Sequence, residues 1–453
     1  MIATFLNNVY EQKVNFFLLR KYSKLSVLLM SVMFLLPYFL CQEGSAQNLV
    51  NNGAGIVVTD GANLIICGSY YNLNDGVSDG KIDLDGTVVV KRNWINKANN
   101  EVLVSAGSGP VGKVILDGAV NQFVSGTQAT LFENLVLKNA KKILGITGCK
   151  VNDTLFVDAT LDLNSRKIKL LNKKPAALTY LSHYILSETN SLEGLGEVEW
   201  YIGQETATYV VPFGSGFEGS SDLSLTLSTK SAGSPSDGSI VFATYPTGCQ
   251  NVPLPSLVYE LDRSYEFLAD RYWIIDALYD EKPEADMVLQ YRPQDIHEGC
   301  NGGLQETEMQ AIRYNPILQT WKDMAPRGYA NPGEHKFYID GISPEDFYAP
   351  WCLAEEPMDW EIFFPNAFTP NGDGINDFYN PVGLNLDQLE LTMYIYNRWG
   401  NLVYVMDDIN RPWDGTTGNS KKICPEGVYA WILFLTDPDG MLHSYQGIIN
   451  LIH

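Results

Sequence analysis

Short runs of alternating apolar and polar residues recur through the first part of this 453-residue chain and restrict what it can fold into. Runs of this kind, bounded by Gly, Asn and Asp, predict short β-strands joined by turns. Leu116, Val136 and Phe156 mark steps about 20 residues apart, the recurrence expected when rungs stack in a solenoid. We therefore predict that residues 47–190 form a parallel β-solenoid with stacks of Ile, Leu, Val and Phe inside. A β-sandwich is the alternative for this region.

Residues 191–356 show a different pattern, in which apolar alternation is combined with aromatic residues and frequent Pro and Gly turns. This pattern predicts a central antiparallel β-sandwich, so that the whole chain is expected to be mainly β. Aromatic side chains in strands are usually core residues, but they can also stack on sugar rings. The tryptophans to be assigned to one role or the other are Trp200, Trp273, Trp321 and Trp351.

The chain carries a formal net charge of −22 at pH 7. A protein that binds nucleic acid needs a surplus of Lys and Arg to neutralise phosphates, and this chain lacks one. We therefore expect no nucleic-acid partner. The charge is consistent with a soluble outer-surface protein that self-repulsion keeps dispersed.

The N-terminal 46 residues have the order of a secretory signal peptide. An uncharged apolar run, Leu25–Leu40, follows basic residues and leads to the small residues Gly44–Ala46. We predict that residues 1–46 are a signal peptide cleaved before Gln47. The alternative is a membrane anchor, for which the run is short because a span needs about 20 apolar residues. Export would permit disulfides among the cysteines that remain.

The most informative part of the chain is residues 361–453, where turn-forming blocks alternate with apolar strands. Glycines in such blocks allow positive φ angles, and roughly seven short strands in about 90 residues is the size of an immunoglobulin-like sandwich. The residues that make up the blocks are Phe364, Pro365, Asn366, Phe368, Thr369, Pro370, Asn371, Gly372, Asp373, Gly374, Asn376, Asp377, Asn397, Arg398, Trp399, Gly400, Trp413, Asp414, Gly415, Gly427, Tyr429 and Gly447.

This ordered set of blocks closely resembles the gliding-motility-associated C-terminal domain of Bacteroidetes, the type B sorting signal of the type IX secretion system. The resemblance implies an immunoglobulin-like sorting and anchoring domain over residues 357–453. It also implies the type IX machinery at the outer membrane as partner, and a location at the outer cell surface or outside the cell. One departure is Phe378-Tyr379 after Asp377, where an aliphatic–aromatic pair is commoner.

Four oxygen-bearing side chains lie close together around two glycines in the first block: Asn371, Asp373, Asn376 and Asp377. Calcium binds to oxygen clusters on sharp turns, so the cluster is a candidate calcium site. It lacks the bidentate Glu and the spacing of an EF-hand loop. The alternative is that these side chains hydrogen-bond to nearby backbone amides and stabilise the turn. We expect no other cofactor.

The chain contains none of the short motifs that mark a nucleophile elbow, a zinc protease, a P-loop or a dinucleotide site. Asp83 and Asp85 share a strand face with Lys81, and paired carboxylates could do acid–base work, although such stripes are usually solvated. We therefore predict a non-enzymatic adhesin-like or structural surface protein that binds surface glycans or other surface proteins. The alternatives are a secreted carbohydrate-active enzyme and a subunit of a surface or motility assembly.

Overall fold

The predicted β class is confirmed by a computed structural model, in which helix is confined, among the described residues, to five one-turn segments. These are η2 (Pro175–Ala177), α2 (Pro293–Ile296), η4 (Glu306–Glu308), η5 (Pro344–Asp346) and η6 (Leu386–Gln388). The structure describes residues 47–99, 102–104, 112–182, 184–188, 195–215, 222–248, 250–256, 258, 268–296, 304–323, 328–347, 349–355, 360–418, 421–437 and 442–453. The predicted signal peptide lies outside these ranges. No helix within them is long and apolar enough to span a membrane.

The described chain divides into two compact units. The first, unit 1, runs to Ala354, and the second, unit 2, runs from Glu355 to His453. The boundary predicted between residues 190 and 191 falls inside unit 1, where one sheet and one hydrophobic core pass through both predicted regions. The boundary predicted near residue 357 lies close to the division between the units.

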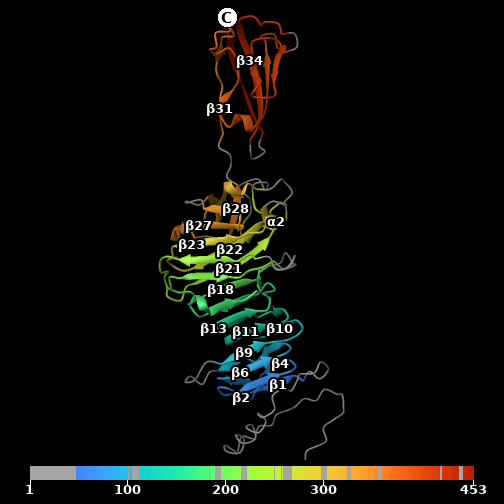
Figure 1. The fold of residues 1–453 in the computed structure, drawn as a ribbon, viewed down its shortest axis with the longest axis vertical. Coiled ribbons are helices and arrows are strands. Elements are labelled where there is room, and N and C mark those ends of the chain that lie inside the picture. Colours follow the sequence, from blue (N-terminus) through green and yellow to red (C-terminus); the bar gives the residue numbers. More distant parts are fainter. Residues whose placement is uncertain are drawn as a thin grey trace, which may run out of the picture. The chain divides into compact units, whose positions relative to one another are not determined.

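The N-terminal part of unit 1 consists of parallel strands in three sheets, and each strand pairs with the third strand after it along much of this region. Figure 1 shows these strands stacked in chain order. The first sheet contains β1 (Leu49–Asn52), β4 (Tyr70–Leu73), β7 (Trp94–Lys97), β10 (Gln122–Gly126), β12 (Lys142–Leu144), β14 (Leu161–Asp162) and β17 (Ile185–Leu186). The second contains β3 (Asn63–Ile66), β6 (Thr87–Val90), β9 (Lys113–Leu116), β11 (Thr130–Lys138), β13 (Cys149–Asp158), β15 (Lys167–Leu170), β16 (Leu178–Tyr180) and β18 (Glu197–Trp200). The third contains β2 (Gly55–Val58), β5 (Lys81–Leu84) and β8 (Leu103–Val104).

The register of the second sheet corrects the predicted interior. Leu116 pairs with Leu137, and Leu137 pairs with Val157, and all three side chains are buried. Val136 and Phe156, which we expected inside, pair with each other on the opposite face and are only half-buried. Side chains alternate between the two faces of a strand, so a difference of one residue moves a side chain from the core to the outer face. The recurrence of about 20 residues located parallel strands that pair with one another but did not identify their buried positions.

Aromatic side chains and a ladder of asparagines fill the interior near the first sheet. The Trp94 ring lies between Tyr70 and Phe132, with centroid distances of 4.5 and 5.2 Å. Three buried asparagines stand in register on β1, β4 and β7, and their side chains bond to turn backbone, as when the Asn72 amide donates to Gly80 O at 2.8 Å. These bonds satisfy backbone groups that would otherwise be buried without partners. The members of the ladder are Asn51, Asn72 and Asn96.

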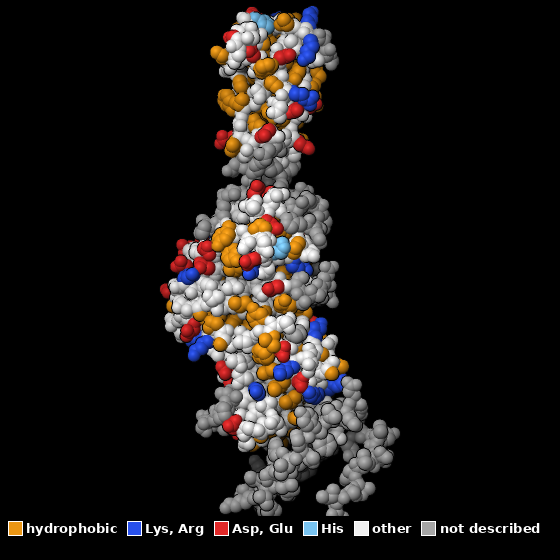
Figure 2. All heavy atoms as spheres, viewed as in Figure 1, with side chains coloured by type: hydrophobic (Ala, Val, Ile, Leu, Met, Phe, Trp, Pro, Cys, Tyr) orange, Lys and Arg blue, Asp and Glu red, His pale blue; other side chains and the backbone are white. Residues whose placement is uncertain are grey.

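Strand direction changes at β18, which pairs in parallel with β15 and antiparallel with β21 (Ser239–Pro246). The second sheet continues through β22 (Arg271–Leu278), β28 (Trp351–Glu355), β24 (Met309–Asn315) and β25 (Thr320–Asp323). A separate antiparallel sheet contains β19 (Thr208–Val211), β20 (Leu225–Thr229), β23 (Ala285–Gln290), β27 (Lys336–Ile342) and β26 (Tyr329–Asn331). On the viewed surface of unit 1, charged side chains of both signs lie among apolar ones (Figure 2).

Unit 2 contains a two-stranded and a five-stranded sheet around its own hydrophobic core. In the five-stranded sheet β30 pairs in parallel with β35, and the remaining pairs are antiparallel. The two-stranded sheet is β29 (Glu361–Phe363) and β31 (Val382–Leu384). The five-stranded sheet follows the order β30 (Ala367–Phe368), β35 (Leu442–Leu451), β34 (Gly427–Thr436), β32 (Glu390–Tyr396) and β33 (Leu402–Met406).

The register of β13 is tested by placing a charge on either face of it. Val157→Asp should lower the free energy of unfolding of unit 1 by about 3–5 kcal/mol, because the carboxylate would be buried without a partner. Phe156→Asp should cost about 1 kcal/mol, because its side chain faces outward. Urea unfolding of the two variants, followed by tryptophan fluorescence, makes the comparison. An equal or larger loss for Phe156→Asp would contradict the register.

Candidate functional site

Asp377 holds the loop that follows β30. Its carboxylate accepts hydrogen bonds from the backbone amides of Gly372, at 2.6 Å, and Gly374, at 2.7 Å. The two glycines have φ angles of 79° and 84°, which side-chain-bearing residues rarely adopt. The loop therefore requires both glycines and a carboxylate placed a few residues after them, which is what the first sequence block provides.

The other three candidate calcium ligands lie in the same loop. Asn371 Oδ1 accepts from the amide of Asp373 at 3.0 Å, and Asp373 Oδ1 accepts from the amide of Ile375 at 2.8 Å. Asn376 adopts a φ of 54°, and its carbonyl accepts from the amide of Thr369 at 2.8 Å. These contacts are those of the turn-stabilising interpretation. Among the described residues no group of three or more His, Cys, Asp and Glu side chains is placed to hold a metal ion, and calcium binding stays a prediction.

Four aromatic residues, three of them from separate blocks, pack together in the core of unit 2. Trp413 is fully buried, and its ring centroid lies 5.1 Å from Phe368 and 5.1 Å from Tyr429. Tyr379 exchanges backbone hydrogen bonds with Trp413 at 2.8 and 2.9 Å, and its ring packs against Phe368. The Tyr429 hydroxyl donates to Pro425 O at 2.7 Å. These aromatic residues therefore hold distant parts of the motif together.

Turn residues flank this aromatic core. Asp414 Oδ1 accepts from the amide of Thr416 at 3.0 Å, and Gly415 has a φ of 75° beside the Pro370 ring. Gly427, with a φ of 147°, begins β34. The Trp-Asp-Gly block thus consists of a buried tryptophan followed by a turn.

A second aromatic contact joins the segment after β29 to β34. Phe364 stacks on Trp431 with a centroid distance of 4.3 Å. Gly447 stands opposite Trp431 across β34 and β35, where a Cβ atom would lie 2.5 Å from the indole ring. Pro365 leads to Asn366, whose carbonyl accepts from the amide of Asn450 at 2.9 Å. Our sequence analysis did not single out Trp431, although it lies in the alternating run that predicted this strand.

The turn between β32 and β33 presents an exposed tryptophan. Asn397 Oδ1 accepts from the backbone amides of Trp399 and Asn401, both at 3.0 Å, and Gly400 has a φ of 78°. The Arg398 guanidinium lies 4.6 Å from the centroid of the Trp399 ring, which is 69% exposed. The block thus forms a hairpin turn and leaves a cation–aromatic pair at its tip.

The sheet, loop and aromatic core described for unit 2 belong to a protein-export signal domain. Residues 362–451 match the family model of the CHU_C type IX secretion signal domain, which confirms the predicted resemblance. The match implies export through the type IX system, interaction with its machinery, and attachment to the cell surface or release from it. The residues before 362 lie outside this match. No curated protein matches the chain.

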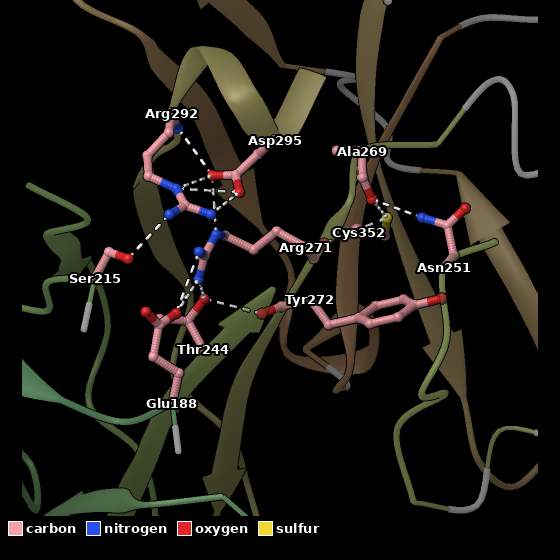
Figure 3. A network of polar contacts seen from close by, with 10 residues as sticks. All are labelled: Glu188, Ser215, Thr244, Asn251, Ala269, Arg271, Tyr272, Arg292, Asp295 and Cys352. Atoms are coloured by element: carbon pink, nitrogen blue, oxygen red, sulfur yellow. Dashed lines mark hydrogen bonds and ion pairs between the residues drawn. The ribbon is translucent and has the colours of Figure 1, made fainter. Parts of the chain in front are cut away.

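Unit 1 contains a buried network of charged side chains that our sequence analysis missed (Figure 3). Arg271 on β22 is fully buried and pairs with Asp295 on α2 at 3.0 Å and with Glu188 at 3.3 Å. Arg292 pairs with Asp295 at 2.7 Å and donates to Ser215 Oγ at 2.9 Å. Glu188 and Arg271 are 83 residues apart and have no local motif, so no sequence signal connected them.

Two carboxyls at the network have pKa values shifted in opposite directions. Burial raises the pKa of Asp295, but Arg271 and Arg292 outweigh this effect and hold that pKa below its usual range. Asp270 lies next to Arg271 in sequence, and its backbone amide donates to Asp295 O at 2.7 Å. Burial, followed by the negative charge of Asp295, raises the pKa of Asp270 to about 6. The network joins β22, α2 and the segment after β17 through polar contacts.

The remaining candidate binding and catalytic residues of unit 1 do not lie together in one site. The four tryptophans proposed as sugar platforms are buried, Trp321 being the most exposed at 7%, and they are core residues. Lys81 is exposed, while Asp83 and Asp85 are half-buried, each with one oxygen that has no partner among the described residues. His335 lies 3.9 Å from Glu306. Two further histidines of the sequence, at positions 183 and 297, lie outside the described residues.

Removing the Asp270 charge should stabilise unit 1 at neutral pH. A carboxyl whose pKa is raised on folding favours the folded state at low pH, and this contribution is lost as pH rises through about 6. Asp270→Asn should therefore raise the free energy of unfolding by about 1–2 kcal/mol at pH 7.5, with the difference vanishing near pH 4.

Thermal unfolding between pH 4 and pH 8 measures this dependence. Asp60→Asn is the matched control, because it removes the same charge from an exposed turn. A gain for Asp270→Asn that is independent of pH, or one equalled by Asp60→Asn, would contradict the assignment.

Proposed function

We propose that this chain is an adhesin-like or structural protein of the outer cell surface, with residues 357–453 as its sorting and anchoring signal. The observation that carries the proposal is the match of residues 362–451 to a type IX secretion signal domain. Such a domain delivers the residues that precede it, so unit 1 is the cargo. A bacterium of the Bacteroidetes is the source that the resemblance favours.

The proposed architecture assigns a β-solenoid to residues 47–190, an antiparallel β-sandwich to residues 191–356 and an immunoglobulin-like sandwich to the signal domain. The pairing of strands such as β3 with β6, and β6 with β9, supports the solenoid, because stacked rungs place equivalent strands side by side. The antiparallel partners of β21 and β23 support the central sandwich. A stack of rungs suits a surface protein because it can extend from the cell surface and needs no catalytic residues to do so.

Two further observations bear on the proposal. Cys67 is disulfide-bonded, as is usual in oxidising compartments outside the cytosol, and this supports export. The buried Arg271 and Asp295 bond to one another and to neighbouring groups, so they support the fold and present no free reacting group. We assign surface glycans or other surface proteins as the partners of unit 1.

Residues 357–453 should be necessary and sufficient for export. In a bacterium with the type IX system, the full chain should reach the cell surface and a chain ending at residue 356 should accumulate in the periplasm. A fluorescent reporter with a signal peptide should be exported when residues 357–453 are fused to its C-terminus. Protease shaving of whole cells measures the exposed fraction. Surface exposure of the truncated chain would contradict the proposal.

The exported chain should bind glycans without cleaving them. The purified protein should bind to immobilised glycans on a glycan array. When it is incubated with the same glycans in solution, neither reducing ends nor unsaturated sugars should be released. Asp83→Asn/Asp85→Asn should leave binding unchanged, because a broad binding face does not depend on one carboxylate pair. Release of sugars that this double substitution abolishes would instead establish the carbohydrate-active enzyme.

A further inference from the structure

The outward positions of β32, β33 and β34 are mostly apolar, whereas those of β35 include Ser444, Gln446 and Asn450 beside Ile448. Along β34 the side chains that point inward, such as Trp431 and Leu433, are buried, while their neighbours Ile432 and Phe434 are 37% and 40% exposed. Most sheets with one solvated face place polar side chains there. We call the apolar part of this surface the outward face and define it by Tyr394, Tyr396, Leu402, Val405, Val428, Ala430, Ile432, Phe434 and Ile448.

These side chains stand next to one another across four strands. Ile448 is opposite Ala430, Ala430 is opposite Tyr396, and Tyr396 is opposite Leu402. One step along the strands, Ile432 is opposite Tyr394, which is opposite Val405. The Tyr394 ring also meets the Phe434 ring edge to face at 6.4 Å. Among the outward positions of the four strands, Glu390 is the one charged side chain.

We propose that the outward face is the surface by which the type IX export machinery recognises this domain, through an uncharged apolar protein surface of its own. This inference rests on the proposed sorting function and adds the location and chemistry of the contact. Burial of exposed apolar surface supplies the favourable free energy, and the lack of charges removes the desolvation cost that ion pairs would add.

The size of the outward face favours a transient partner over a second copy of this chain. Three spacings of about 4.8 Å across the strands and six rises of about 3.4 Å along β34 give roughly 300 Å². A stable protein–protein interface needs about 800 Å² from each partner. A contact of this smaller size suits a cargo that must be released after export.

The charge of the surrounding unit favours a protein partner over a lipid surface. Residues 360–453 contain four Lys or Arg and eleven Asp or Glu, a net charge of −7. An anionic membrane surface repels a unit of this charge, because attraction to such lipids depends on clusters of Lys and Arg. A neutral apolar protein surface meets no such repulsion, since the charges lie outside the outward face.

The test uses the full chain, expressed in a bacterium with the type IX system. Ile432→Lys/Ile448→Lys places two charges on the outward face at exposed positions, so the core should be unaffected. Phe363→Lys/Val382→Lys is the matched control, because it adds the same charges at exposed positions of the two-stranded sheet of the same unit. Thermal unfolding of the purified proteins should show the same transition for unit 2 in both variants. Where Ile432→Lys/Ile448→Lys unfolds unit 2, Ile432→Thr/Ile448→Thr replaces it.

We expect the outward-face variant to lose about tenfold in surface exposure relative to the wild type, which corresponds to roughly 1.4 kcal/mol of binding free energy. The control variant should reach the surface as the wild type does. Equal export of both variants would overturn the inference and leave the sorting function intact. Export that does not depend on residues 357–453 at all would instead overturn the sorting function.

A photo-crosslinking amino acid at Phe434 identifies the occupant directly. The expected product is an adduct with an outer-membrane protein of the type IX machinery that is lost in a strain lacking that machinery. An adduct with a second copy of this chain, or with lipid alone, would overturn the inference.

Discussion

Parallel backbone pairing between successive strands of each sheet is the constraint on which the N-terminal part of unit 1 depends. In the second sheet the chain of partners runs from β3 through β6, β9, β11 and β13 without a change of direction. This pairing brings Leu116, Leu137 and Val157 into one buried row, and it brings Val136 and Phe156 into another row outside. No single strand could bury its apolar side alone, so each depends on its neighbours.

The change of strand direction after β18 places a different demand on the fold. The antiparallel strands that follow pack closely around Arg271, and a buried guanidinium is tolerated only when it is paired. Asp295 and Glu188 supply that pairing from two other segments (Figure 3). The network therefore ties α2 and the end of the parallel region to β22. Burial, followed by the negative charge of Asp295, raises the pKa of the neighbouring Asp270.

The motif residues of unit 2 have two physically different roles. The aromatic members, including Phe368 and Trp413, are buried and hold the sheet together. The Asn, Asp and Gly members shape exposed loops, as Asp377 does through two backbone amides. Neither group lies on the outward face, which contains apolar residues such as Ile432 outside the motif. The motif thus secures the domain, while residues without a motif give it an apolar surface.

The sequence by itself determined the β class, the position of the strands and the presence of the secretion signal domain. These features depend on alternation, turn residues and a block order that can be read within a few residues of one another. Only the tertiary structure decided the register of the parallel strands, the burial of all four tryptophans from Trp200 to Trp351, and the pairing of Arg271 with Glu188. Each of these is a contact between residues far apart in the chain. Alternation shows that one face of a strand is buried, and the neighbouring strands decide which face it is.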